Sequence, residues 1–131
     1  MNSRALGTFE VAVLPLAADS ADTGGFDRLS LDKQFSGDLK GTSRGQMVAA
    51  NTAVEGSGAY VALERVSGVL NGRTGSFILQ HNGTMGHGVY EMRITVVPDS
   101  GTGELTGLTG TMNIIVEGGK HSYEFESTIG S

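Results

Sequence analysis

The sequence predicts an all-β fold, an eight-stranded antiparallel up-and-down β-barrel with almost no helix. Glycine accounts for 21 of the 131 residues, more than twice its usual share of about 7%. These glycines separate short runs of β-branched and aromatic residues, which is the pattern of a sandwich or a barrel. No window of about eleven residues shows the spacing of an amphipathic helix. We expect the chain, residues 1–131, to form one domain.

Eight segments are expected as strands, because each combines β-forming residues with turn residues at its ends. Their ranges are 8–14, 26–35, 43–53, 59–70, 74–81, 89–97, 105–116 and 121–129. Residues 1–7 and 129–131 are expected to fray, as the ends of a domain commonly do. A chain of this length can bury roughly two-thirds of its unfolded surface.

The central hairpin has a register that the sequence itself defines. Asn71–Gly72 joins two β-rich runs and is the strongest short-range signal for a two-residue turn. Such a turn places Glu64 opposite Leu79 and Ala62 opposite His81. One face of this hairpin therefore holds a carboxylate and an imidazole among apolar side chains.

The last hairpin separates an apolar face from a polar face. Its turn is Gly118–Gly119, and residues along both strands alternate between large apolar and polar types. Segment 89–97 repeats this alternation. The side chains expected to point into the barrel from these three strands are Tyr90, Met92, Met112, Ile114, Tyr123 and Phe125.

One end of the barrel is expected to be a pocket mouth. Consecutive antiparallel strands alternate in direction, so every second loop lies at the same end. His81 and His121 fall beside the loops of one end, and Tyr60 and Tyr90 lie within a few residues of them. The loops of the other end are short and rich in glycine, so we expect that end to be closed by turns.

Composition excludes several classes of function. The net charge of −5 and the scattered basic residues argue against a nucleic-acid or anionic membrane surface. No apolar run is long enough to span a membrane as a helix, and the N-terminus lacks the pattern of a secretory signal. Cysteine is absent, which excludes thiol chemistry and fits a cytoplasmic protein. The histidine spacing matches no known ligand motif, so we expect neither a metal nor a cofactor.

Five segments resemble the allene oxide cyclase-like barrel superfamily. They are KQFSGDLKGTS (33–43), AYVALER (59–65), GRTGSFILQHNG (72–83), VPDSGTGELTGLTG (97–110) and HSY (121–123). The similarity is closest to an uncharacterised bacterial family of unknown function within it. The resemblance implies an eight-stranded barrel, often oligomeric, whose members bind or cyclise small hydrophobic molecules. It transfers no catalytic residue to this chain, because the functional segments of the plant cyclase have no match here.

Glu64 and His81 are the candidate catalytic residues. An unpaired carboxylate in a barrel interior has a raised pKa and can transfer a proton near neutral pH, and His81 can act as a proton shuttle. The alternative is that Glu64 forms a structural ion pair with Lys33 or His81. Lys33 interrupts an apolar stripe, and we expect it to extend its ammonium to solvent rather than to bind a substrate carbonyl or carboxylate.

Three functions are compatible with these residues. The first is a barrel that binds a small hydrophobic or weakly polar molecule, the second an isomerase or cyclase that uses Glu64 and His81, and the third a fully packed interaction module. Apolar side chains on the outward face, at Val61, Leu63, Val69 and Ile78, predict a homo-oligomer. The residues expected to contact a ligand are Lys33, Tyr60, Phe77, Leu79, Tyr90, Met92, Met112, Ile114, His121, Tyr123 and Phe125.

Overall fold

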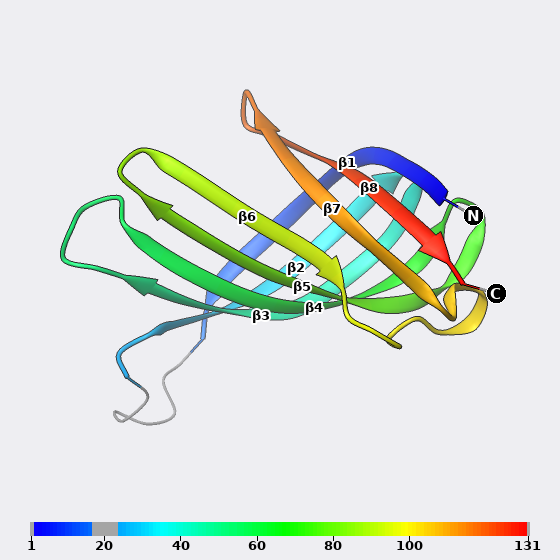
Figure 1. Ribbon diagram of the computed structural model, residues 1–131, viewed down its shortest axis with the longest axis horizontal. Coiled ribbons are helices and arrows are strands. Elements are labelled where there is room, and N and C mark those ends of the chain that lie inside the picture. The colour runs from blue at the N-terminus through cyan, green and yellow to red at the C-terminus, as the bar shows by residue number, and fades with distance from the viewer. Residues whose placement is uncertain (1, 17–23, 131) are drawn as a thin grey trace.

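The computed structural model describes residues 2–16 and 24–130, and these form a closed antiparallel β-barrel (Figure 1). Each strand pairs with the next along the chain, and β1 pairs with β8 to close the barrel. The predicted fold class is confirmed. The elements are β1 (Asn2–Pro15), β2 (Asp27–Gly37), β3 (Leu39–Asn51), β4 (Gly58–Leu70), β5 (Arg73–Gly86), β6 (Val89–Val96), the short 3₁₀ turn η1 (Gly103–Leu105), β7 (Leu108–Glu117) and β8 (Lys120–Ile129).

Both hairpin registers read from the sequence are confirmed. Leu70 pairs with Arg73 across the Asn71–Gly72 turn, and Glu117 pairs with Lys120 across Gly118–Gly119. Asn71 and Gly72 have φ values of 49° and 83°, which are the left-handed conformations that a type I′ hairpin turn requires. Because side chains alternate between the two faces of a strand, this register fixes which side chains point inward along the whole β4–β5 pair.

The fifth strand is longer than its sequence indicates. Residues 82–86 were expected to be a loop because they include Asn82 and two glycines, which are poor strand formers. In the structure they pair with β4 on one side and β6 on the other, and the turn is reduced to His87 and Gly88. Hydrogen bonding to two neighbouring strands outweighs the weak local preference.

The N-terminal segment is also a strand, which corrects the expectation that residues 1–7 fray. Residues 2–9 pair with β8 from Thr128 to His121, and Ala5 is fully buried. These are the hydrogen bonds that close the barrel, so closure orders a segment with little strand propensity of its own. The β8 strand extends to Ile129. Met1 and Ser131 lie outside the described residues.

The end of the barrel formed by the β2–β3 and β4–β5 turns is filled by its own side chains. The rings of Phe77 and Phe125 stack at 5.7 Å, and the edge of one ring in the Phe35–Tyr123 pair meets the face of the other at 5.7 Å. Leu39, also fully buried, belongs to the same cluster. This half of the barrel holds the buried aromatic and aliphatic side chains of the hydrophobic core.

In the segment between β6 and β7, side-chain hydroxyls take the place of a neighbouring strand for part of β5. The hydroxyls of Ser100 and Thr102 accept the backbone N–H groups of Ile78 and Ser76, each at 3.0 Å. The expected turn in this glycine-rich stretch is confirmed, with Gly103 at a φ of 59°. These residues therefore provide hydrogen-bond acceptors for the backbone N–H groups of β5 that lie beyond its pairing with β6.

The β6–β7 pair is the weakest seam of the barrel. Only Ile94–Met112 and Thr95–Thr111 are paired among the described residues, whereas neighbouring strands pair along most of their length. Toward the β5–β6 and β7–β8 turns the two strands diverge, as Figure 1 shows. Residues 89–93 and 113–117 therefore face each other without a hydrogen-bonded ladder.

A buried tyrosine ties β8 to the turn between β2 and β3. The Tyr123 hydroxyl accepts the Leu39 N–H at 2.9 Å and lies 2.9 Å from the Ser36 carbonyl, to which it donates. Glycine is needed beside it, because a Cβ on Gly7 would lie 2.4 Å from this hydroxyl. Tyr123 thus holds the closed end of the barrel.

We expect Tyr123→Phe to destabilise the protein by about 1–3 kcal/mol, because the Leu39 N–H would lose its partner in a buried site. The measurement is urea unfolding followed by circular dichroism. Tyr90→Phe is the matched control, since Tyr90 is 55% exposed and its loss should cost less than about 0.5 kcal/mol. Equal effects of the two changes would contradict the role assigned to Tyr123.

Candidate functional site

Three ionisable side chains meet inside the barrel, and each comes from a different strand. Lys33 lies on β2, Glu64 on β4 and His81 on β5. The Lys33 Nζ is 3.0 Å from Glu64 Oε2, and the His81 Nε2 is 3.4 Å from Glu64 Oε1. Their side chains are 5%, 0% and 5% exposed. We call these three residues the internal cluster.

The backbone around Glu64 is shaped for this arrangement. Gly45 pairs with Glu64 across β3–β4, and a Cβ at Gly45 would lie 2.7 Å from the Glu64 Cα. The neighbouring inward residue of β3, Ser43, donates its hydroxyl to Glu64 Oε2 at 3.4 Å. Small residues on β3 therefore leave the space that the carboxylate and its partners occupy.

The electrostatics of Glu64 differ from the sequence-based expectation. Burial by itself raises the pKa of the Glu64 carboxyl, but the adjacent His81 imidazole and Lys33 ammonium outweigh burial and hold that pKa below its ordinary value. The raised pKa expected for an unpaired carboxylate is therefore wrong, because Glu64 is paired. The alternative expectation was a structural ion pair of Glu64 with Lys33 or His81. In the structure the Glu64 carboxylate contacts both of these residues.

Lys33 does not extend to solvent, which corrects a second expectation. Its residue exposure is 4%, and its ammonium lies 5.0 Å from the centre of the Phe9 ring and 5.9 Å from that of Phe35. Two aromatic faces and one carboxylate replace its hydration shell. The sequence missed this because β2 and β4 are not neighbours in the sheet, so no hairpin register brings Lys33 toward Glu64.

Two polar atoms of the cluster are incompletely satisfied. Glu64 Oε1 and His81 Nε2 are buried, and their 3.4 Å contact falls outside hydrogen-bond geometry. Neither atom has a hydrogen-bond partner within residues 2–16 and 24–130. Buried polar atoms without partners are uncommon in native proteins and carry a free-energy cost. The cluster therefore contains a close ion pair together with two buried polar atoms that can each still form a hydrogen bond.

A cavity of about 410 Å³ lies inside the barrel above this cluster, toward the end where the β5–β6 and β7–β8 turns lie. Lys33 and His81 contribute to its wall, and the other lining side chains are mostly apolar or aromatic. The predicted mouth is therefore present as a cavity. It is lined by Phe9, Val13, Leu31, Lys33, Met47, Tyr60, Ala62, His81, Tyr90, Met92, Ile114, Val116 and His121.

Two of the predicted tyrosines meet at this cavity. The hydroxyls of Tyr60 on β4 and Tyr90 on β6 are 3.2 Å apart and share a hydrogen bond. Burial, followed by this contact with Tyr90, raises the pKa of the Tyr60 phenol. Tyr60 is therefore neutral at physiological pH, and it presents a ring with a polar but uncharged edge to the cavity.

The predicted ligand contacts divide into two groups. Those that line the cavity are Lys33, Tyr60, Tyr90, Met92, Ile114 and His121. The others are buried outside it and pack the closed half or the ring of core around it; they are Phe77, Leu79, Met112, Tyr123 and Phe125. Sequence reasoning missed several lining residues on the first three strands, namely Phe9, Val13, Leu31 and Met47, although the alternation used for the last hairpin applies equally to them.

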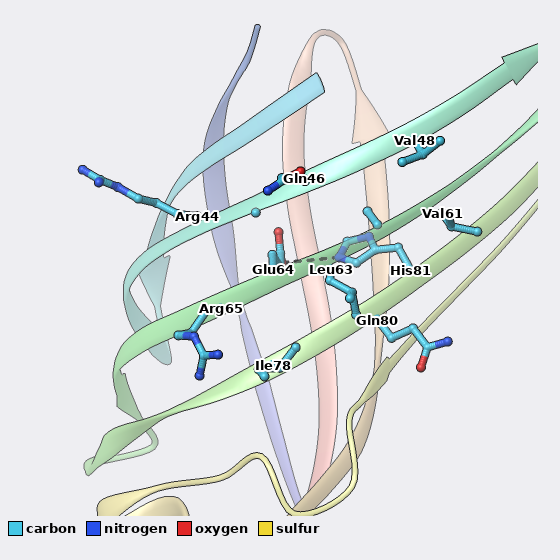
Figure 2. A pocket seen from close by; sticks show the side chains of 12 residues that line it. Arg44, Gln46, Val48, Val61, Leu63, Glu64, Arg65, Ile78, Gln80 and His81 are labelled. Atoms are coloured by element: carbon cyan, nitrogen blue, oxygen red, sulfur yellow. Dashed lines mark ion pairs between the residues drawn. The ribbon is translucent and has the colours of Figure 1, made fainter. Parts of the chain in front are cut away.

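A second concavity lies on the outer surface of β3, β4 and β5 (Figure 2). Its volume is about 640 Å³, larger than that of the interior cavity, and Val61 and Leu63 in its wall are each 56% exposed. Glu64 and His81 are also among the residues that line it, and the dashed line in Figure 2 marks the contact between them. We assign the site to the interior because Lys33 lines that cavity and not the outer one, together with His81 and the predicted tyrosines Tyr60 and Tyr90. Whether a second copy covers this outer face stays a prediction.

The described part of the chain, residues 2–16 and 24–130, offers neither a metal site of the usual ligands nor a membrane-spanning helix. No group of three or more histidine, cysteine, aspartate or glutamate side chains there is placed to hold a metal ion. Within the same residues, no helix has the length and apolar character needed to cross a membrane.

The fold and site define a closed eight-stranded β-barrel with a buried ion-pair cluster beneath an apolar cavity. The chain belongs to the family described as "Protein of unknown function (DUF3224)", which it matches over residues 5–126. A crystal structure of a DUF3224 protein of unknown function from Shewanella oneidensis MR-1 is 47% identical, with a TM-score of 0.92. The alignment covers 100% of this chain and 99% of that one.

The expected membership of a family of unknown function is thereby confirmed. No curated protein matches the sequence. The wider link to allene oxide cyclase-like barrels stays a prediction.

We expect Glu64→Gln to destabilise the protein by about 3–5 kcal/mol, because it leaves the Lys33 ammonium buried without a countercharge. The free energy of unfolding in urea at neutral pH measures this change. Lys33→Met combined with Glu64→Gln should recover most of the loss, and Glu126→Gln on the exposed outer face is the matched control. A stable Glu64→Gln single variant would show that the pair contributes little.

The lowered pKa of Glu64 also predicts a pH dependence. The unfolded chain binds this proton more readily than the folded protein does, so folding stability falls as the pH drops below the ordinary glutamate pKa of about 4.3. The wild type should lose more stability on acidification than the Lys33→Met/Glu64→Gln variant, and both retain His81. Parallel pH profiles for the two proteins would refute the assignment.

Proposed function

We propose that this protein binds a small hydrophobic or weakly polar molecule inside the barrel. The observation that carries the proposal is the cavity of about 410 Å³, whose walls are mainly apolar and aromatic and which Lys33 and His81 also line. Binding sites typically combine an apolar concave wall with a few converging polar groups, in volumes of about 300–1,000 Å³. The cavity lies toward the lower end of that range, so the ligand is small.

The weak β6–β7 seam supports the same proposal. Tyr90 and Met92 on β6 and Ile114 and Val116 on β7 line the cavity, and all four lie in the part of the seam that has no hydrogen-bonded ladder. Separation of these strand ends widens the cavity without breaking any backbone pairing present in the structure. The same wall can therefore admit a ligand and contact it.

An isomerase or cyclase that uses Glu64 and His81 is the second candidate. The unsatisfied Glu64 Oε1 and His81 Nε2 favour it, since incomplete pairing of buried groups is a common property of reactive sites. Against it, the lowered pKa makes Glu64 a weak base, and Glu64 is not among the residues that line the interior cavity. A fully packed interaction module has the least support, because it requires an interior without such a cavity.

The test replaces one residue of the cavity wall with a larger one, whose side chain then occupies the cavity. Ile114 lines the cavity, and the next residue on β7, Ile115, faces outward and is 36% exposed. We expect Ile114→Trp to weaken binding of the neutral dye Nile red by more than about tenfold, which corresponds to ~1.4 kcal/mol, whereas Ile115→Trp changes it by less than about twofold. Dye fluorescence titrated against each folded variant gives the dissociation constants.

This matched pair separates the interior cavity from the exposed apolar face. Both changes add the same apolar ring on one strand, so non-specific partitioning of the dye to the new side chain is comparable, and each titration uses the folded variant. Equal weakening by the two variants, or dye binding that neither variant changes, would place the dye elsewhere and contradict the proposed function.

A further inference from the structure

The Lys33 ammonium has hydrogen-bonding capacity that the protein leaves unused. An ammonium carries three N–H donors, and among the described residues Glu64 Oε2 is the one carboxylate oxygen that forms an ion pair with it. The rings of Phe9 and Phe35 lie near the same group and offer π-electrons rather than an acceptor atom. Lys33 also lines the cavity. An acceptor atom of a molecule in the cavity would therefore reach a donor that is already buried and fixed.

The charge balance of the cluster limits what that acceptor can be. Lys33 and Glu64 neutralise each other, since they form an ion pair in which both side chains are at least nine-tenths buried. A carboxylate on the ligand would place a second anion close to Glu64 in a site with little water, and an extra buried charge of this kind is costly. An uncharged carbonyl oxygen gains the Lys33 hydrogen bond without that cost.

We propose that the cavity selects an apolar molecule with one uncharged carbonyl, such as a ketone, an aldehyde or an ester, whose oxygen accepts a hydrogen bond from Lys33 Nζ. The inference rests on the proposed binding function and specifies its ligand class. Glu64 then has a positioning role, because it holds the ammonium beside the cavity and cancels its charge. The mostly apolar walls contact the remainder of the molecule.

The test compares three probes with the same number of carbons at neutral pH: methyl hexyl ketone, octanoate and octane. Each is titrated into wild-type protein carrying Nile red, and displacement of the dye gives its affinity. We expect the ketone to bind at least tenfold more tightly than octanoate and at least threefold more tightly than octane. These ratios are measured on the wild-type protein, so they do not depend on a variant that folds.

The Lys33→Met/Glu64→Gln variant then assigns the preference to the ion pair. It removes both charges together and should keep octane binding, while the advantage of the ketone over octane disappears. Lys40→Met, an exposed change on the outer face of β3, is the matched control and should retain the ketone preference.

The failures of the two proposals are distinguishable. Displacement by octanoate that equals or exceeds displacement by the ketone would overturn the ligand class but leave the binding function intact. Equal affinities of the ketone and octane, or a ketone preference that survives in the double variant, would remove Lys33 as the selecting donor. Failure of all three probes to displace a dye that the Ile114 variant shows to be in the cavity would overturn the ligand class as well. Failure of the dye to occupy the cavity would overturn the binding function and this inference together.

Discussion

The pairing of β4 with β5 is the constraint on which the interior depends. Its two-residue turn leaves no freedom in register, and a shift by one residue would turn every side chain of one strand to the opposite face. Glu64 and His81 enter the barrel through this register, with Val66 and Phe77 beside them as core. The same constraint that builds the hydrophobic core therefore also places a carboxylate within it.

The ion pair that results divides the barrel into two regions with different physical character. Below it, buried aromatic rings and leucines form the hydrophobic core, and the Tyr123 hydroxyl ties β8 to the β2–β3 turn. Above it, the walls are still apolar, but the space between them is not filled. A barrel of eight strands is at the size where either outcome is possible, and this chain has both.

The sequence was sufficient for the fold and for part of the site, for identifiable reasons. Local signals such as Asn71–Gly72 specified hairpins, and alternation specified the inward face, so Tyr60, Met92 and Ile114 were placed correctly at the cavity. Interactions between strands that are not sheet neighbours left no such signal. The burial of Lys33 against Glu64 depends on curvature that closes the sheet, and the lowered pKa of Glu64 follows from that contact.

Closure of the barrel by β1 and β8 has a mechanical consequence. Asn2 pairs with Thr128, and both ends of the described chain emerge at the closed end of the barrel, side by side in Figure 1. Hydrogen bonds between antiparallel strands run perpendicular to the strands. A force that pulls the two ends apart would therefore act along these hydrogen bonds. It would load the Asn2–Thr128 pair first and then each following pair, so that the bonds break one after another. The molecule would yield to such a force at its termini, while the cavity lies at the far end and would be the last part to feel it.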